Sequence, residues 1–377
     1  YAHVFDKNFQ GWRNEAPVER WVKKEKLSLL CENGSVSLEF QRETGHGSFT
    51  AFLNPFLRWL SSIVESAGGM VATGVKVDSI IFENGFARGV RAGPDNIDAD
   101  YIIIAEGANT LLLEKHGIKK TPNLNETSLG IKEVIKLGKD TINSRFSLDD
   151  DEGLAQFILG QPLHGLLGGG FLYTMKEYVT LGVVVRLSEF EVKGFNAKDI
   201  VEDLRVSPHL NKILEGGTPV EYSAHLVTES GYEGVMKKPY GNGFVVVGDA
   251  AGFLLNTGFT IRGVDMAVES GRLAAEAIAK AHEEGGNSQE LLSGYKKMLN
   301  DSFIMKNLKN FSKAGKFLLN EKIYNGYVNL ACSTANGIFD ESEEAKRVFE
   351  SFKGALKGEK ISFLSLLKEA WEAYRSI

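Results

Sequence analysis

The stretch Gly243-Phe-Val-Val-Val-Gly-Asp-Ala-Ala-Gly-Phe253 decides the fold of this chain. Phe244 to Val247 is a short apolar run between glycines, which is typical of a strand buried on both faces. The run ends in Gly248-Asp249, and from Val264 onward the apolar residues recur with a period of 3.6, which predicts a long helix. The sequence therefore predicts a buried strand that ends at the carboxylate of Asp249. A glycine-rich connection, residues 248–263, then leads to the helix, and we call it the glycine-rich crossing.

This crossing combines the groups that a flavin needs. Glycines let the backbone approach a ligand closely, and the helix start near Arg262-Gly263 offers unpaired N–H groups and a positive dipole end. The carboxylate of Asp249 suits ribityl or ribose hydroxyls, and the backbone donors suit the pyrimidine carbonyl. Asp249 could equally be a helix N-cap. The second glycine set, Asn256-Thr-Gly258 to Arg262-Gly263, favours the ligand, since a cap does not need it.

A second strand ends in the same way. In Ala99-Asp-Tyr-Ile-Ile-Ile-Ala-Glu-Gly-Ala-Asn-Thr110, the segment Tyr101 to Ala105 predicts a buried strand, and Glu106-Gly107 predicts a tight exit. An ordinary strand, turn and helix is the alternative. In open α/β sheets ligands sit beyond the carboxyl ends of strands. We therefore expect Glu106-Gly107 and Gly248-Asp249 to converge on one cleft.

The stretch from Gly243 to Val264 resembles the second FAD signature of a large flavoprotein family, which contains aromatic hydroxylases, geranylgeranyl reductases and quinone-linked dehydrogenases. The wording Gly-Asp-Ala-Ala-Gly followed by Asn-x-Gly-Phe-Thr-Ile-Arg-Gly is most similar to FixC-type dehydrogenases, relatives of the electron-transfer-flavoprotein:quinone oxidoreductases. The resemblance implies FAD as the cofactor, and it implies that Glu106-Gly107 stands where the family has its middle Asp-Gly motif. The expected cofactor-binding residues are Gly248, Asp249, Ala250, Gly258, Arg262, Gly263, Glu106 and Gly107.

The segment Gly165-Leu-Leu-Gly-Gly-Gly-Phe-Leu-Tyr-Thr174 carries four glycines but lacks the Gly-Lys-Ser/Thr ending of a phosphate loop. A strand relaxed by glycine, with a bulge, is one interpretation. In FixC-type proteins the matching segment belongs to the sheet over the reacting face of the flavin. The resemblance therefore implies that Phe171 and Tyr173 are candidates for lining the substrate pocket. His225, in a later strand, is expected to be structural.

Composition excludes several classes. The 377 residues are 43% hydrophobic and 24% charged, with a net charge of −6, so nothing indicates nucleic-acid binding. Cys31 and Cys332 match no metal spacing, and a cluster would need four ligands. Scarce cysteine fits a cytoplasmic protein. No apolar run approaches the roughly 18 residues of a spanning helix. Peripheral contact with the inner face of a membrane stays open.

We expect an α/β fold that combines a Rossmann-like FAD-binding domain, a β-sheet substrate domain and a helical C-terminal region. The expected FAD-binding domain is 54–124 with 240–285, the β-rich substrate or quinone domain is 1–53 with 125–239, and the helical region is 286–377. The sequence contains no Gly-x-Gly-x-x-Gly. Compared with the family, the chain looks like the fold without its first strand, first helix and second strand. We therefore expect the 377 residues alone to bind FAD more weakly and to be less active.

Local patterns predict the remaining elements. Residues 1–22 read as irregular, 26–41 as a hairpin turning at Asn33-Gly34, and Asn54-Pro55 as a helix start with Asn54 as cap. Amphipathic spacing predicts C-terminal helices over 289–299, 301–318, 341–352 and 361–374. Lysines fall on or near one face of the second: Lys306, Lys309, Lys313 and Lys316. That face is either solvated or a landing surface for anionic headgroups or an acidic partner.

The resemblance implies an FAD-dependent oxidoreductase that takes electrons from an electron-transfer flavoprotein and passes them towards quinone or ferredoxin. The flavin does the chemistry, so no catalytic acid or base is expected. A separate ferredoxin-like iron–sulfur subunit is expected, because this chain has too few cysteines for a cluster. One alternative is a geranylgeranyl (prenyl lipid) reductase. The alternative from another class is a truncated, non-catalytic interaction protein with a flavoprotein fold.

Overall fold

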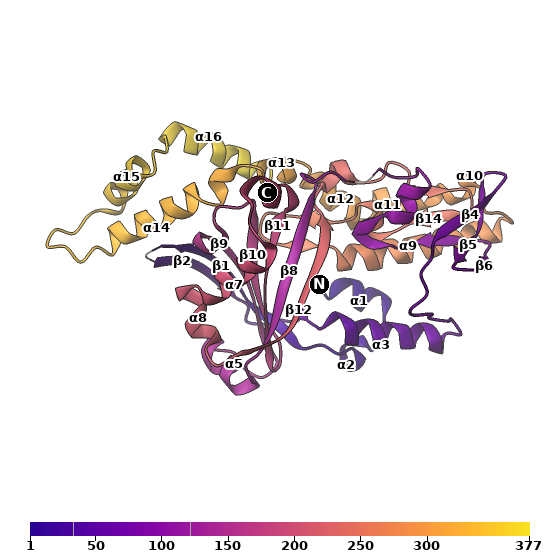
Figure 1. Cartoon of the computed structure of the whole chain (residues 1–377), viewed down its shortest axis with the longest axis horizontal. Coiled ribbons are helices and arrows are strands. Elements are labelled where there is room, and N and C mark those ends of the chain that lie inside the picture. Colours follow the sequence, from indigo (N-terminus) through magenta and orange to yellow (C-terminus); the bar gives the residue numbers. More distant parts are fainter. Residues whose placement is uncertain (33, 121) are drawn as a thin grey trace.

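The computed structural model describes residues 1–32, 34–120 and 122–377. A large eight-stranded sheet dominates one part of the molecule, a smaller α/β unit lies beside it, and helices form the C-terminal end (Figure 1). The mixed α/β class expected from the sequence is therefore confirmed. No helix in the described part of the chain is both long and apolar enough to cross a membrane.

The large sheet has the strand order β12-β8-β11-β10-β9-β1-β2, and β3 pairs with β1. Neighbouring strands are antiparallel except β1 and β9, which run parallel. The strands are β1 (Arg20–Cys31), β2 (Gly34–Gln41), β3 (Phe49–Thr50), β8 (Thr127–Lys136), β9 (Glu152–Gly160), β10 (Gly168–Thr174), β11 (Tyr178–Arg186) and β12 (Thr218–Thr228). The predicted turn Asn33-Gly34 includes a residue outside the described ranges.

Helices cover one face of this sheet. Alternate strand residues such as Ile131, Leu172 and Val183 are fully buried, because side chains in a strand alternate between two faces. They pack with buried apolar residues of the covering helices in one core. These helices are α5 (Lys139–Phe146), α6 (Leu187–Lys193), α7 (Ala197–Val206) and α8 (Pro208–Leu214).

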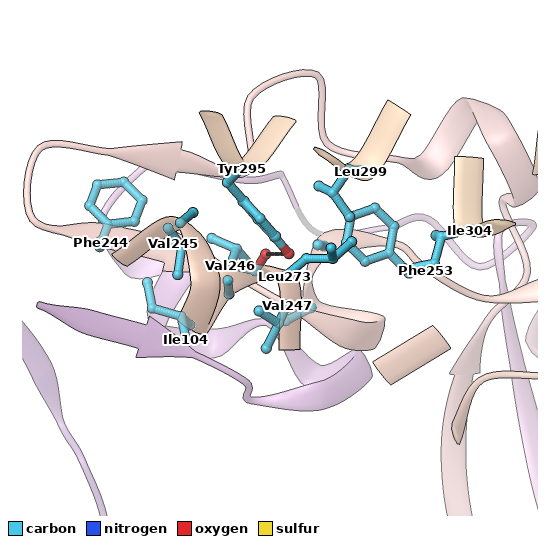
Figure 2. Packing of buried hydrophobic residues seen from close by; sticks show 14 of the residues in the cluster. Ile104, Phe244, Val245, Val246, Val247, Phe253, Leu273, Tyr295, Leu299 and Ile304 are labelled. Carbon is cyan, nitrogen blue, oxygen red and sulfur yellow. Dashed lines mark hydrogen bonds between the residues drawn. The ribbon is translucent and has the colours of Figure 1, made fainter. Parts of the chain in front are cut away.

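The smaller unit is built on a three-stranded sheet with the order β13-β14-β7, in which β14 and β7 are parallel. Its strands are β13 (Tyr240–Gly241), β14 (Phe244–Val246) and β7 (Ile102–Ile104). A separate antiparallel sheet contains β4 (Ser79–Glu83), β5 (Phe86–Ala92) and β6 (Asp95–Asp98). The predicted long helix is confirmed as α9 (Val264–Glu283). Figure 2 shows the resulting core, where the hydroxyl of Tyr295 donates to the carbonyl of Val246 at 3.1 Å.

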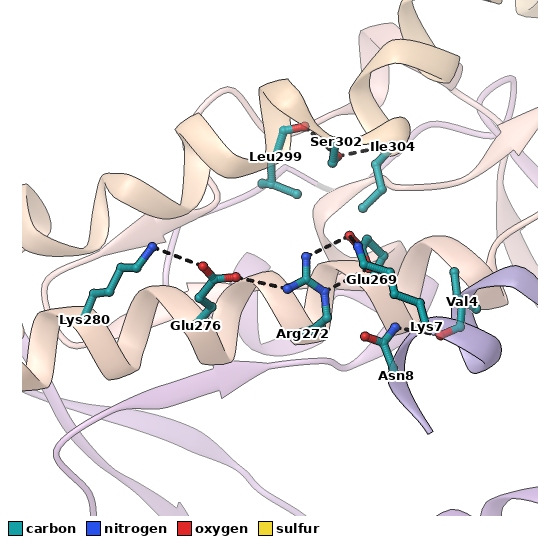
Figure 3. A network of polar contacts seen from close by, with 10 residues as sticks. All are labelled: Val4, Lys7, Asn8, Glu269, Arg272, Glu276, Lys280, Leu299, Ser302 and Ile304. Atoms are coloured by element: carbon teal, nitrogen blue, oxygen red, sulfur yellow. Dashed lines mark hydrogen bonds and ion pairs between the residues drawn. The ribbon is translucent and has the colours of Figure 1, made fainter. Parts of the chain in front are cut away.

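Part of the N-terminal segment is helical, so the irregular structure expected for residues 1–22 is wrong over those helices and over the start of β1 at Arg20. Its helices are α1 (His3–Asn8) and α2 (Trp12–Glu15), and Phe5 of α1 packs against Trp12, Phe49 and Phe56. Lys7 in α1 donates to Glu269 in α9 at 2.9 Å, and Figure 3 shows this pair within a row of ion pairs along α9. α3 (Leu53–Ser66) follows Phe52 as N-cap, so Asn54 is not its cap.

The C-terminal region is more broken than its sequence pattern predicted. The expected helices over 289–299 and 301–318 are each interrupted, and 341–352 is helical only from Val348 onward. The observed helices are α10 (Gln289–Leu292), α11 (Gly294–Asp301), α12 (Phe303–Asn310), α13 (Ala314–Phe317), α14 (Gly326–Ile338), α15 (Val348–Gly358) and α16 (Phe363–Tyr374). Ser302 marks the boundary between α11 and α12, where its side chain accepts from the amide of Ile304 and caps the new helix. The interruptions inside the two expected helices fall at Ser293 and at residues 311–313.

Candidate functional site

The two glycine turns come together where β7 and β14 end. Val246 lies opposite Ile104, and the amide of Val247 donates to the carbonyl of Ile104 at 3.0 Å. Gly107 and Gly248 then adopt φ angles of 72° and 59°, in the left-handed region that favours glycine. The short helices that follow, η1 (Gly107–Asn109) and η4 (Gly248–Ala251), lie in contact. The structure thus brings together two segments about 140 residues apart in sequence.

Asp249 presents a carboxylate that no described residue hydrogen-bonds. It is the second residue of η4 and is only partly exposed. The N-cap of α9 is Gly263, so Asp249 does not cap that helix. A Cβ atom built on Gly263 would lie 3.4 Å from Oδ1 of Asp249, which places the carboxylate beside the start of α9. Burial raises the pKa of Asp249, and the charges of His225 and Lys119 oppose that shift.

Lys119 is a site residue that sequence reasoning missed. Its ammonium nitrogen donates to the carbonyl oxygen of Ala250 at 2.9 Å. Burial lowers the pKa of Lys119, while the nearby carboxylates of Asp249 and Glu106 act in the opposite direction. A lysine in the run Gly117-Ile-Lys-Lys120 carries no signal that separates it from a solvated lysine. Only the folded chain shows that this charge lies among the two carboxylates.

Glu106 uses its carboxylate within the fold. Oε2 accepts from the amide of Leu112 at 2.7 Å, and Oε1 accepts from the amide of Leu113 at 3.0 Å. These amides belong to the first turn of α4 (Leu111–Lys115), whose N–H groups have no partner inside the helix. Glu106 therefore anchors α4 against the end of β7. The backbone at Gly107 is the part of this motif that stays close to η4.

Arg262 and Gly263 lie at the start of α9, and the side chain of Arg262 is held by its neighbours. Its Nε donates to Oδ2 of Asp265 at 3.0 Å, and the ring of Tyr1 lies 4.3 Å from the guanidinium carbon. His3 also contacts Asp265 at 3.3 Å. Because Asp265 is 2% exposed, this group of side chains fixes the start of the helix. It leaves the first backbone N–H groups of α9 as the donors available to a ligand.

Gly258 lies elsewhere in the glycine-rich crossing. It forms the turn of a short hairpin between β15 (Leu255–Asn256) and β16 (Ile261–Arg262), with φ of 87°. Its amide donates to the side chain of Asn256 at 2.8 Å. A Cβ atom there would meet Ile377 at 3.2 Å and Leu318 at 3.6 Å. Gly258 therefore packs against the C-terminal region, whereas Gly248, Ala250 and Gly263 surround Asp249.

The large sheet contributes an aromatic pair. Phe171 and Tyr173 are two positions apart in β10, so their side chains lie on the same face of the strand. Their ring centroids are 5.2 Å apart, with an interplanar angle of 29°. Burial of the hydroxyl end raises the pKa of Tyr173 to about 12, although 38% of the whole residue is exposed, and Tyr1 adds to the shift.

A cavity of about 630 Å³ runs beside β7. It is lined by Ile102 to Glu106 and by residues of α4 and the segment before β4, and it does not reach Asp249. β7 is an edge strand in the described part of the chain, and Ile103 is 45% exposed. The cavity therefore follows an open strand edge rather than the carboxylate site.

One protein-family model matches part of the chain. It is described as "ETF-QO, ubiquinone-binding" and covers residues 127–227, from β8 to β12. The matched part contains both Phe171 and Tyr173.

Two curated relatives from Escherichia coli K12 match almost the whole chain. YdiS, named as a probable electron transfer flavoprotein-quinone oxidoreductase, is 35% identical over 374 residues, covering 98% of this chain and 86% of its own. The protein FixC is 33% identical over 373 residues, with the same two coverages.

Solved structures share the fold at low identity. A geranylgeranyl bacteriochlorophyll reductase-like protein from Thermoplasma acidophilum superposes with a TM-score of 0.70 at 18% identity, covering 98% of this chain and 87% of its own. The halogenase PltM in complex with phloroglucinol and FAD gives a TM-score of 0.59 at 12% identity, covering 96% and 76%.

Proposed function

The chain belongs to the family of FixC proteins and electron-transfer-flavoprotein:quinone oxidoreductases, and from that premise we propose that it passes electrons from an electron-transfer flavoprotein through FAD towards a quinone. Family membership makes it an FAD-dependent oxidoreductase. The observation that carries the proposal for this site is the carboxylate of Asp249, which has no hydrogen-bond donor among the described residues and lies beside the start of α9.

The residues at this site fit FAD. A partly buried carboxylate without a protein donor can accept hydrogen bonds from ribityl or ribose hydroxyls. The N–H groups of the first turn of α9 can face the pyrimidine carbonyl, and the positive end of the helix dipole stabilises negative charge there. When bound, FAD itself accepts and donates the electrons. The chain then has to bind and orient the cofactor, which is the role we assign to Gly248, Asp249, Ala250 and Gly263.

Glu106 and Lys119 stabilise the turns that form the proposed cofactor site. Glu106 holds α4 through two backbone amides, so it stabilises the turn at Gly107 rather than offering its carboxylate to the cofactor. Lys119 balances the negative charge of Asp249 and holds the carbonyl of Ala250. Because charges interact more strongly away from bulk water, a cation here affects how readily Asp249 stays ionised.

The quinone side is proposed to be the aromatic face of β10. Phe171 and Tyr173 stack on each other on this face. Aromatic rings bury a large area and suit a planar apolar ring such as a quinone. In the proposed domain division, the FAD-binding domain is 54–124 with 240–285, the quinone-side domain is 1–53 with 125–239, and the helical region is 286–377.

An iron–sulfur cluster, where the electron path uses one, is proposed to come from a separate ferredoxin-like subunit. The chain has two cysteines, fewer than a cluster needs. Four lysines of α12, α13 and the turn between them are exposed and form no ion pair with a described residue: Lys306, Lys309, Lys313 and Lys316. Such a face suits an acidic partner, because opposite charges steer association. Peripheral contact with a membrane is also compatible with a lipid-soluble acceptor.

Reduction of a prenyl lipid is the second candidate function. The specific support is the superposition on the geranylgeranyl reductase-like protein, and at 18% identity this shows a shared fold. The sequence relatives at 33–35% identity favour the electron-transfer reaction instead.

The test is stopped-flow reduction of the full-length protein by a reduced electron-transfer flavoprotein, followed by mixing with a soluble quinone. We expect the visible absorbance of the oxidised flavin to bleach and then to return with quinone. Full-length protein that binds no flavin would exclude the enzyme, and flavin reoxidised by a prenyl lipid but not by quinone would favour the reductase. Iron analysis of the same sample tests the proposal of a separate iron–sulfur subunit, since a stoichiometric cluster in the single chain would contradict it.

A further inference from the structure

The structure brings together the two cysteines of the chain. Cys31 is the last residue of β1 and Cys332 lies in α14, 301 positions later. Their Cα atoms are 6.6 Å apart and their sulfurs are joined as a disulfide. Cα separations of roughly 4.4–6.8 Å are those found across disulfides. Nothing in the sequence spacing of the two cysteines indicates that they form a pair.

Their surroundings are suited to a covalent link. α14 packs on β1, β2 and β9, and a small apolar core of Leu159, Tyr324 and Val328 lies between the helix and the sheet. The side chain of Cys31 packs against this core. Both cysteines are partly exposed, so a small thiol reagent can reach them. His209 holds the end of β1 in place through its contact with the carbonyl of Cys31 at 3.3 Å.

We propose that Cys31 and Cys332 are a redox modification site, at which a reversible disulfide fastens the C-terminal helices to the large sheet. The oxidant is a low-molecular-weight disulfide of the glutathione class. One cysteine thiolate attacks it, its S–S bond breaks, and one thiol leaves. The second cysteine thiolate then attacks the protein sulfur of the mixed disulfide and releases a second thiol. The protein loses two electrons and two protons, and the reagent is reduced to two thiols.

The disulfide also affects the helices that follow α14. α14 is followed by α15 and α16, and α16 has an exposed apolar face made by Phe363, Leu364, Leu367, Trp371 and Tyr374. Within the C-terminal region, Glu369 ties α16 to the segment before α14. α14 is the helix of this group that packs on β1, β2 and β9, so the disulfide adds a covalent link to these packing contacts. This inference does not depend on the proposed electron-transfer reaction.

The first experiment counts thiols in the full-length protein, with allowance for any cysteine outside the 377 residues. The protein is equilibrated with oxidised glutathione or with excess reduced dithiothreitol, and then alkylated and mapped under non-reducing conditions. We expect both thiols of the pair to disappear on oxidation and a peptide that joins Cys31 to Cys332 to appear in monomeric protein. Two thiols that persist, or glutathione that stays attached to either cysteine, would overturn the proposal.

The second experiment tests the fastening. Hydrogen exchange in α14 is compared between oxidised and reduced protein, and we expect slower exchange on oxidation by on the order of ten- to a hundredfold. Cys332→Ser is the matched control, and its exchange should not respond to oxidised glutathione. Equal exchange in α14 for oxidised and reduced wild-type protein would show that the bond does not fasten the helices. Thiol titration of the wild-type protein decides the first claim even if the variant folds poorly.

Discussion

The ammonium nitrogen of Lys119 lies 2.9 Å from the carbonyl oxygen of Ala250, the residue that follows Asp249. This contact joins the segment after α4 to the turn after β14, although the two are 131 residues apart in sequence. The same ammonium opposes the rise that burial causes in the pKa of Asp249. One cation thus supports both the shape of the turn and the charge of the carboxylate that we assign to the cofactor.

Lys119→Met should shift the pH dependence of FAD binding. The pKa of Asp249 is already raised by burial, so FAD affinity should fall as the pH drops through that raised pKa. Removing the ammonium takes away one charge that lowers the pKa, so the loss should begin at a higher pH. The measurement is fluorescence titration of FAD at several pH values. Lys120→Met, at an exposed neighbour, is the control, and identical pH profiles for both variants and wild type would contradict the assigned role.

Asp249→Asn should weaken FAD binding, because it removes a charged acceptor for ligand hydroxyls. Charge-assisted hydrogen bonds of this kind contribute on the order of 1–3 kcal/mol, or roughly 5- to 150-fold in affinity. Equilibrium titration of full-length apoprotein with FAD measures the change. Asp95→Asn, on the exposed strand β6, removes the same charge away from the site. Unchanged affinity in Asp249→Asn would remove this residue from the cofactor site.

Glu106→Gln should cost stability more than it costs FAD affinity. The carboxylate accepts from two amides in the first turn of α4, and an amide side chain has only one oxygen to replace both. Loss of a cap of this type costs about 1 kcal/mol in the free energy of unfolding. Urea unfolding and FAD titration of the same preparation give both numbers. An affinity loss as large as that of Asp249→Asn, with unchanged stability, would instead place the Glu106 carboxylate on the cofactor.

Gly182→Ala should disturb the aromatic face of the large sheet. A Cβ atom at Gly182 in β11 would overlap the ring of Phe171 and the carbonyl of Ile131. Overpacking of this kind costs roughly 1–3 kcal/mol, and we expect a higher KM for quinone as Phe171 moves. Gly130→Ala, on the adjacent strand β8, is the control, because its nearest neighbour would be 3.5 Å away. Equal quinone kinetics in both variants would remove Phe171 from the quinone pocket.

Glu369→Gln should reduce stability near neutral pH and make it less sensitive to acid. Burial alone would raise the pKa of Glu369, but hydrogen bonds from Lys322, Tyr327, Ser365 and Asn320 lower it to about 2. A depressed pKa means that this stabilisation is present above the unfolded pKa of roughly 4.5 and is lost as pH falls towards 2.

Urea unfolding of wild type, Glu369→Gln and the exposed control Glu372→Gln between pH 7 and pH 2 tests this. Wild type and Glu369→Gln should differ at pH 7, on the order of 1–3 kcal/mol, and converge at the acid end. A constant difference across the whole pH range would show that the loss is not electrostatic.

The sequence by itself determined the elements whose pattern is local. The apolar run from Phe244 to Val247 between glycines became β14, and the 3.6 period from Val264 became α9, because a short run and its own flanking residues decide both. The convergence of Glu106-Gly107 with Gly248-Asp249 also followed from sequence, since parallel strands end at the same edge of a sheet. The sequence motif of the glycine-rich crossing indicated the same family as the relatives that match the chain.

Only the tertiary structure decided which distant residues became neighbours. The position of Lys119 at Ala250, of Tyr1 against Arg262, and of Cys31 against Cys332 depends on how segments over a hundred residues apart pack. The amphipathic pattern over 301–318 could not reveal its own break, because buried residues keep their helical spacing across the turn between α12 and α13. Periodicity reports which residues are buried, and packing alone determines what they are buried against.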